Sequence, residues 1–156
     1  MLLLLDPPPG QPPWAGGATP LGCLRGVSHE QAAWPPAAGR HSIWEFVLHI
    51  AYWKYAVRRK LEGSAKGGFP RKPSDWPRVP DPPNAAAWKR DRALLRDQHR
   101  RLVDAVRAFD PRRLDERPPG SRSYRYADLL YGIVTHDTYH VGQIQLVKRL
   151  YQSAQG

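Results

Sequence analysis

The chain has 156 residues, which suits a single domain with one hydrophobic core, and its hydrophobic fraction of 41% is that of a globular protein. Its one cysteine, Cys23, excludes an intrachain disulfide and a Cys-rich zinc module, so a reducing, cytoplasmic setting is expected. No apolar run approaches the roughly 18 residues of a membrane span, and the net charge of +10 is scattered without a nucleic-acid-binding motif, so neither a membrane protein nor a dedicated nucleic-acid binder is expected.

The front of the chain is rich in proline and glycine. Residues 1–5 are apolar but too few for a signal-peptide core, and residues 6–19 predict an extended lead-in. Residues 20–27 form a short apolar stretch that indicates at most a weak first helix. Ser28 is a suitable N-cap for one further helical turn, which the Trp34-Pro35-Pro36 sequence would end. We therefore expect a lead-in over residues 1–19 and a helical domain over residues 20–152.

The first strong helix is predicted over residues 42–62. Ser42 and Glu45 have the spacing of a capping box, in which each side chain satisfies a free backbone N–H group. Gly63 ends the helix, and the proline-rich residues 63–83 then predict a long loop, either ordered by packing of its aromatic residues or shaping a pocket rim. One face of this helix is apolar at spacings of three and four residues: Phe46, His49, Ile50, Trp53 and Val57.

Two more helices follow. The middle one is capped by Asp81 or Asn84, and it ends at Asp110-Pro111 after an apolar seam of Trp88, Leu95, Leu102, Val106 and Phe109. The last runs from near Tyr124 to about Gln152, with an inner stripe of Leu129 or Leu130, Ile133, His136, His140, Ile144 and Val147. No segment alternates with period two, so the pattern predicts an all-α four-helix bundle with long loops rich in proline and glycine.

Three histidines fall on these apolar faces. His136 and His140 lie four residues apart on one face of the last helix, and His49 lies on the inner face of the first strong helix. An unpaired polar group buried there costs about 1–3 kcal/mol unless it is bonded or ligated. The competing interpretation is that each ring simply bonds a backbone carbonyl or a tyrosine hydroxyl. Three inward imidazoles together favour one site for Zn, Ni, Fe or Cu with an open coordination position.

The other candidate residues have weaker patterns. His29 and His41 fall in loop-like sequence, whereas His99 lies within the middle helix and is the one plausible substitute ligand. Asp137 takes the place of the glutamate in the H-E-x-x-H helix of zinc proteases, but it is one methylene shorter, so proteolysis is disfavoured. Asp137 is instead either a helix-surface carboxylate or an acceptor that orients a ligand imidazole. Gln143 would hold a metal-bound water or form a hydrogen bond within the bundle.

Two stretches of the chain resemble the DinB/YfiT-like superfamily of metal-binding four-helix bundles. They are residues 42–51 (SIWEFVLHIA) and residues 132–144 (GIVTHDTYHVGQI), and with the middle helix the resemblance covers roughly residues 20–152. It implies an up-down-down-up bundle, frequently a homodimer, in which His49, His136 and His140 bind Zn or Ni. The prolines and glycines near the front replace much of a long first helix, so this helix is expected to be shortened or irregular.

The resemblance also implies a range of activities. Family members include S-transferases that use bacillithiol or mycothiol, a mycothiol-dependent isomerase, hydrolases and proteins induced by DNA damage. We therefore expect a cytoplasmic metal-dependent enzyme acting on a small molecule, either a bacillithiol-type thiol S-transferase or a hydrolase. An arginine such as Arg58, or one from the proline-rich loop, would hold an anionic thiol. The alternative is a non-catalytic metal-binding or DNA-associated stress-response protein.

Overall fold

The structure, a computed structural model, describes residues 2–8, 18–64 and 67–156, and all regular secondary structure in these residues is helical. This confirms the predicted all-α bundle. None of the described helices is long and apolar enough to cross a lipid bilayer. The elements, in chain order, are α1 (Leu2–Leu5), η1 (Gly22–Leu24), α2 (His29–Ala33), α3 (Ile43–Leu61), α4 (Ala85–Ala108), η2 (Pro111–Arg113) and α5 (Tyr126–Gln155).

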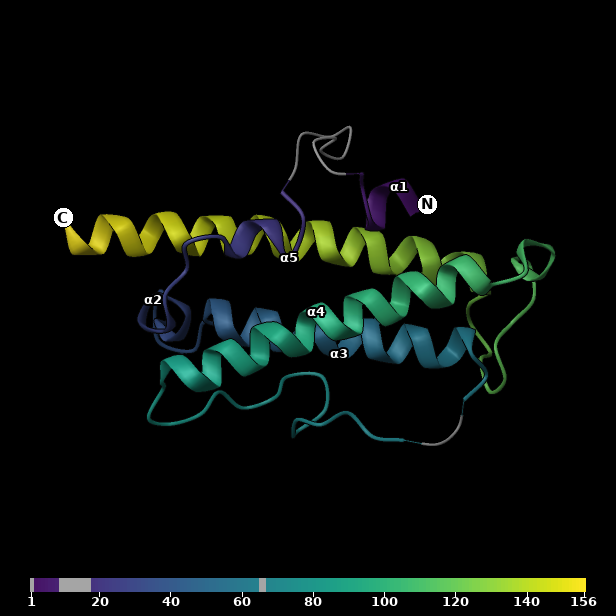
Figure 1. Cartoon of the computed structure of the whole chain (residues 1–156), viewed down its shortest axis with the longest axis horizontal. Helices are drawn as coiled ribbons and strands as arrows, with labels where there is room; N and C mark the ends of the chain where they lie inside the picture. Colours follow the sequence, from purple (N-terminus) through teal and green to yellow (C-terminus); the bar gives the residue numbers. More distant parts are fainter. Residues whose placement is uncertain (1, 9–17, 65–66) are drawn as a thin grey trace.

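Helix α3 is the centre of the molecule. It packs against both α4 and α5, and Figure 1 shows the three long helices lying together along the long axis, with α4 crossing in front of α3. Its inner residues are fully buried, among them Trp44 and Ile50, because apolar positions recur at helical spacing on the faces toward both neighbours. Any side chain on these inner faces of α3 therefore lies between two other helices.

The helix starts follow local capping. Ser42 and Glu45 form the predicted capping box, with the Glu45 carboxylate accepting the Ser42 backbone N–H at 2.7 Å. Of the two residues proposed as caps for α4, Asn84 serves, because its side-chain oxygen accepts the Ala87 N–H at 2.9 Å. Helix α5 begins at Tyr126, two residues later than expected, and extends to Gln155.

Short elements stand where a long first helix would be. The predicted weak helix over residues 20–27 is only the 3-10 turn η1, whereas the turn capped by Ser28 is α2, with the Ser28 hydroxyl accepting the Gln31 N–H at 3.2 Å. The apolar start forms α1, which lies against α4 with Leu5 buried. Much of the predicted lead-in, residues 9–17, lies outside the described residues.

Two residues in the first half of the segment between α3 and α4, Phe69 and Arg71, fasten it to the bundle. Phe69 is buried in the core beside Tyr52 and Tyr55. Arg71 binds Asp91 of α4 with its Nε 2.9 Å from the carboxylate, which also accepts the Trp44 indole N–H at 2.8 Å. These contacts carry the following residues of the loop across one face of the bundle, next to the inner histidines.

Candidate metal centre

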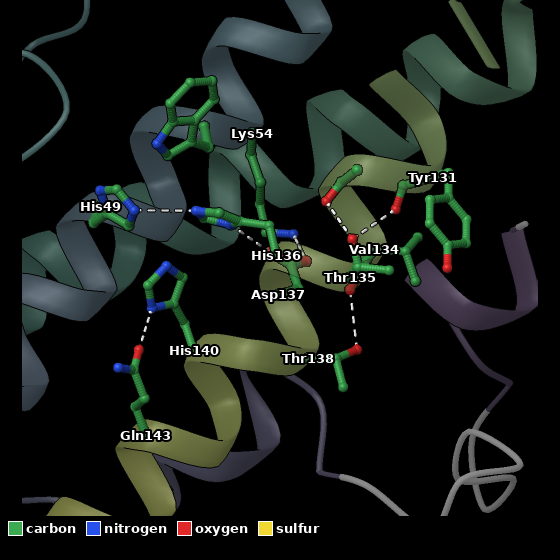
Figure 2. Close-up of polar contacts among 12 residues, drawn as sticks. His49, Lys54, Tyr131, Val134, Thr135, His136, Asp137, Thr138, His140 and Gln143 are labelled. Atoms are coloured by element: carbon green, nitrogen blue, oxygen red, sulfur yellow. Dashed lines mark hydrogen bonds and ion pairs between the residues drawn. The ribbon is translucent and has the colours of Figure 1, made fainter. Parts of the chain in front are cut away.

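Three imidazoles meet between α3 and α5. His49 comes from α3, and His136 and His140 come from α5, one helical turn apart. One ring nitrogen from each lies within 4.8 Å of the other two, and the Nε2 atoms of His49 and His136 are 3.0 Å apart. Figure 2 shows the three side chains pointing toward one another from the two helices. The structure thus brings together the three histidines that the sequence singled out.

Two of the rings are held so that Nε2 faces the others. The Nδ1–H of His49 donates to the backbone carbonyl of Asp75 at 2.8 Å. The Nδ1–H of His140 donates to the side-chain oxygen of Gln143 at 2.6 Å, as Figure 2 shows. Since each acceptor is an oxygen without a hydrogen, the proton sits on Nδ1, and Nε2 keeps its lone pair. Gln143 therefore orients the candidate ligand His140, and the partner of the hydrogen bond predicted for Gln143 within the bundle is His140.

The cluster fits a transition-metal ion. Imidazole nitrogens bind Zn at about 2.0–2.1 Å, so two ligands at a tetrahedral angle lie about 3.4 Å from each other. The separations of 3.0 Å and up to 4.8 Å bracket this value, so small side-chain shifts would bring all three nitrogens to one ion. Because the Nε2 lone pair of His49 faces Nε2 of His136 at 3.0 Å, the space between these two nitrogens holds either the proton of a hydrogen bond or a cation. A set of three neutral nitrogen donors suits Zn, Ni or Cu.

Burial keeps the rings of His49 and His140 uncharged. It lowers the pKa of His49, with the nearby His136 contributing in the same direction, although the hydrogen bond to Asp75 opposes the shift. For His140, burial and then the proximity of His136 lower the pKa to about 4. Because the neutral imidazole is the metal-binding form, two of the three rings are ready to ligate at neutral pH without first losing a proton.

The loop after α3 places two residues, Asp75 and Trp76, beside the histidine cluster, and the spacing of the histidines did not predict them there. Trp76 stacks on His49 with ring centroids 3.8 Å apart and on His41 at 3.7 Å, so it lies between the two imidazoles. Asp75 has a φ of 70° and uses its carbonyl for His49 and its carboxylate for the Trp53 indole N–H at 2.8 Å. The loop therefore closes one side of the cluster and fixes one ring.

Asp137 is not a helix-surface carboxylate. It is buried, 6% exposed, and forms an ion pair with Lys54 of α3, whose side chain is fully buried. Burial is the largest single effect and opposes its ionisation, but Lys54 and His136 together outweigh burial and hold the pKa of Asp137 below its usual value. Its other oxygen, Oδ1, has no hydrogen-bond partner and lies 3.9 Å from Nδ1 of His136. The surface alternative fails because residue 137 faces α3.

The remaining histidines stay outside the cluster. His29 begins α2 and pairs with its neighbour Glu30 at 3.1 Å, and His41 lies on the far side of Trp76. His99, the proposed substitute ligand, is absent from the set of converging side chains found among the described residues. Arg58 lies nine residues beyond His49 on α3 and binds Glu62 at 2.6 Å, so it is not at the cluster.

The comparisons with known proteins agree with the sequence motifs. A protein-family model described as the DinB superfamily matches residues 20–144, which include all three histidines. No curated protein and no solved structure matched the chain.

Proposed function

Since the chain belongs to the DinB superfamily and gathers three histidines at one point, we propose that it is a metal-dependent enzyme. His49, His136 and His140 bind a divalent transition metal, Zn or Ni, and the site transfers a low-molecular-weight thiol of the bacillithiol type to an electrophile or hydrolyses a small molecule. The observation that carries the proposal is the orientation of His49 and His140, whose Nδ1 atoms are both occupied as donors while Nε2 faces the shared centre.

A bound metal ion would supply a positive charge that lowers the pKa of a coordinated thiol or water, so that a nucleophile exists at neutral pH. Three protein ligands leave at least one position for that group. The chain's own residues have separate roles. Asp75 and Gln143 hold two ligand rings in place, and Trp76 covers His49 against solvent. The net charge of +10 raises the local concentration of an anionic thiol or substrate.

The alternative of a DNA-associated protein depends on an unpaired basic surface. On α4, Arg100 and Arg101 both bind Asp97, at 2.8 and 2.7 Å, and Arg107 binds Asp6 at 3.0 Å. These pairs reduce the positive potential that phosphate contacts would need. The two functions separate by salt: DNA affinity should fall steeply between about 50 and 200 mM salt, whereas thiol transfer should depend on metal.

Metal content of the purified protein tests the proposal. We expect about one Zn or Ni per chain in the native protein and in the control variant His29→Ala, because His29 lies outside the cluster. The variants His49→Ala and His136→Ala should each lose the metal while keeping their helical circular dichroism. Equal trace metal in all four proteins would contradict the proposal.

An activity measurement then tests the chemistry. Metal-loaded native protein is incubated with bacillithiol and an electrophile such as monochlorobimane, and loss of free thiol is followed beside a chelator-treated sample. Conjugation that disappears with the metal and with His136→Ala supports thiol transfer. Metal-dependent hydrolysis of small esters or amides without thiol consumption supports the hydrolase activity. A metal-loaded protein inactive in both assays would contradict the enzyme proposal.

A further inference from the structure

A groove lies between α3 and α5 beside the three histidines. Its volume is about 260 Å³, and its walls are formed mainly by Trp53, Val57, Leu129, Gly132, Ile133 and His136. An apolar cavity of about 150 Å³ is enough to hold benzene, so this groove has room for an aromatic ring or a short branched alkyl chain. The groove therefore offers a binding volume of small-molecule size.

The groove and the histidine cluster share a wall. Trp53 contacts both His136 and His49, with ring centroids 5.9 and 6.4 Å apart. The indole is held in this position because its N–H donates a hydrogen bond to the carboxylate of Asp75, and the backbone carbonyl of Asp75 also fixes His49. A molecule in the groove therefore lies directly against the ring of His136, one of the three rings of the cluster.

The walls provide apolar contact and little else. Apart from His136, the hydrogen-bonding side chains at the rim already have partners: the Asp128 carboxylate accepts the backbone N–H of Arg125 at 2.8 Å, and the Tyr124 hydroxyl accepts a hydrogen bond from Lys60 at 3.0 Å. No lysine or arginine is among the described lining residues. The occupant is therefore an uncharged apolar group and not the anionic part of a thiol cofactor.

Gly132 keeps the groove open. A Cβ built at this position meets no atom within 4 Å, so the fold itself does not require glycine there. Glycine within a helix lowers helix stability by about 1 kcal/mol relative to alanine. In α5 this destabilising residue occurs at a position that lines the groove. A longer side chain at position 132 would take up part of the space.

We propose that this groove binds the apolar, aliphatic or aromatic group of the substrate whose reacting atom meets the metal at the histidines. The inference rests on the proposed function, and it adds the substrate class: compounds that join a thiol-reactive or hydrolysable centre to an apolar substituent of about benzyl size. The Trp53 and Ile133 surfaces supply the contact, and His136 marks the end of the groove at which the reacting atom lies.

The test compares two thiols as ligands of the cobalt-loaded protein. Benzyl mercaptan carries an apolar ring, whereas 2-mercaptoethanol does not, and binding of either as thiolate to Co(II) produces a charge-transfer absorption band. Burial of about 55 Å² of ring surface in a half-open groove gives benzyl mercaptan about tenfold tighter binding. Gly132→Leu should remove most of this tenfold preference while changing the Kd of 2-mercaptoethanol less than about twofold.

Gly142→Leu is the matched control. Gly142 is also a glycine of α5 with open space at its Cβ position, but it does not line the groove. This variant receives the same gain in helix propensity and should keep the native preference. Gly132→Ala, which fills less space, should reduce the preference by about half on a logarithmic scale. Circular dichroism and the cobalt stoichiometry establish that all variants fold and load alike.

The outcomes separate the two proposals. Selective loss of benzyl mercaptan affinity in Gly132→Leu, absent in Gly142→Leu, supports the groove as the substrate site. An equal effect on both thiols, or none on either, overturns the groove while leaving thiol binding at the metal intact. If the cobalt-loaded native protein binds neither thiol, the thiol chemistry of the proposed function is wrong, and the inference fails with it.

Discussion

Replacing Lys54 by methionine should cost about 3–5 kcal/mol of the free energy of unfolding. The Lys54 side chain is fully buried, and its ammonium binds the buried carboxylate of Asp137. Methionine keeps much of the aliphatic stem but removes the charge, so the carboxylate is left in the interior without a counterion. The second oxygen of Asp137 already lacks a hydrogen-bond partner, and the nearby Nδ1 of His136, 3.9 Å away, is too distant to replace the ammonium as a donor. Such a loss is a large part of the about 5–15 kcal/mol that stabilises a typical domain.

The loss should also depend on pH in a defined direction. In the native protein, burial raises the pKa of Asp137, but Lys54 and His136 together hold it below its usual value. The ionised carboxylate therefore contributes stability above the unfolded-state pKa of about 3.9, and this contribution is lost as pH falls further. Without Lys54, only His136 opposes burial, which is the largest effect, so the pKa of Asp137 should rise above its unfolded value. The Lys54→Met protein should therefore be less destabilised, relative to the native protein, at pH 5 than at pH 7.

Urea unfolding followed by circular dichroism measures these effects. Lys89→Met is the control, because Lys89 is an exposed residue of α4 and its loss should change stability by less than about 0.5 kcal/mol. The double variant Lys54→Met/Asp137→Leu removes both charges and should be more stable than Lys54→Met alone. A Lys54→Met variant as stable as the Lys89→Met control would refute the assignment of a buried, mutually dependent pair.

Three further predictions follow from the same contacts. Gln143→Leu removes the acceptor of the His140 N–H and should weaken metal binding about 10–100-fold in chelator competition, whereas Gln145→Leu on the same helix should not. Burial lowers the pKa of His99 to about 4, below its unfolded value of about 6.5, so the stability of the native protein should fall as pH drops from about 6.5 to 4. In urea unfolding, His99→Gln should reduce the slope of stability against pH by at most about 1.4 kcal/mol per pH unit. An unchanged slope would contradict the burial of His99. Trp76→Ala exposes one face of the His49 imidazole and should increase the rate at which a chelator removes the metal, with no change in helix content by circular dichroism.

The helices and the histidines were predictable because their signals are local. The capping box at Ser42 and Glu45 lies within four residues, and the apolar spacing of α3 and α5 reflects the helical period alone. His49, His136 and His140 were conspicuous because polar rings recurred on apolar stripes. Their convergence followed once α3 and α5 packed face to face.

The partners of these rings could not be found in the same way. Lys54 lies on the buried side of α3, but a lone lysine among apolar neighbours is ordinarily exposed, so only its pairing with Asp137 across 83 residues explains the position. Trp53 was predicted on the inner face of α3, yet it is 38% exposed, because it lies at the edge where the groove opens. Both positions depend on how α3 and α5 are rotated against each other, which the apolar period does not determine.

The loop after α3 adds a constraint that neither helix supplies. Its residues 75 and 76 contact His49 by a carbonyl hydrogen bond and by ring stacking, and Arg71 ties the same loop to Asp91 of α4. A ligand ring gains affinity when its free orientation is already restricted before the ion arrives. The order of this loop and the metal affinity are consequently linked, since whatever loosens the loop releases the ring of His49, and an ion bound to that ring stabilises the loop contacts in return.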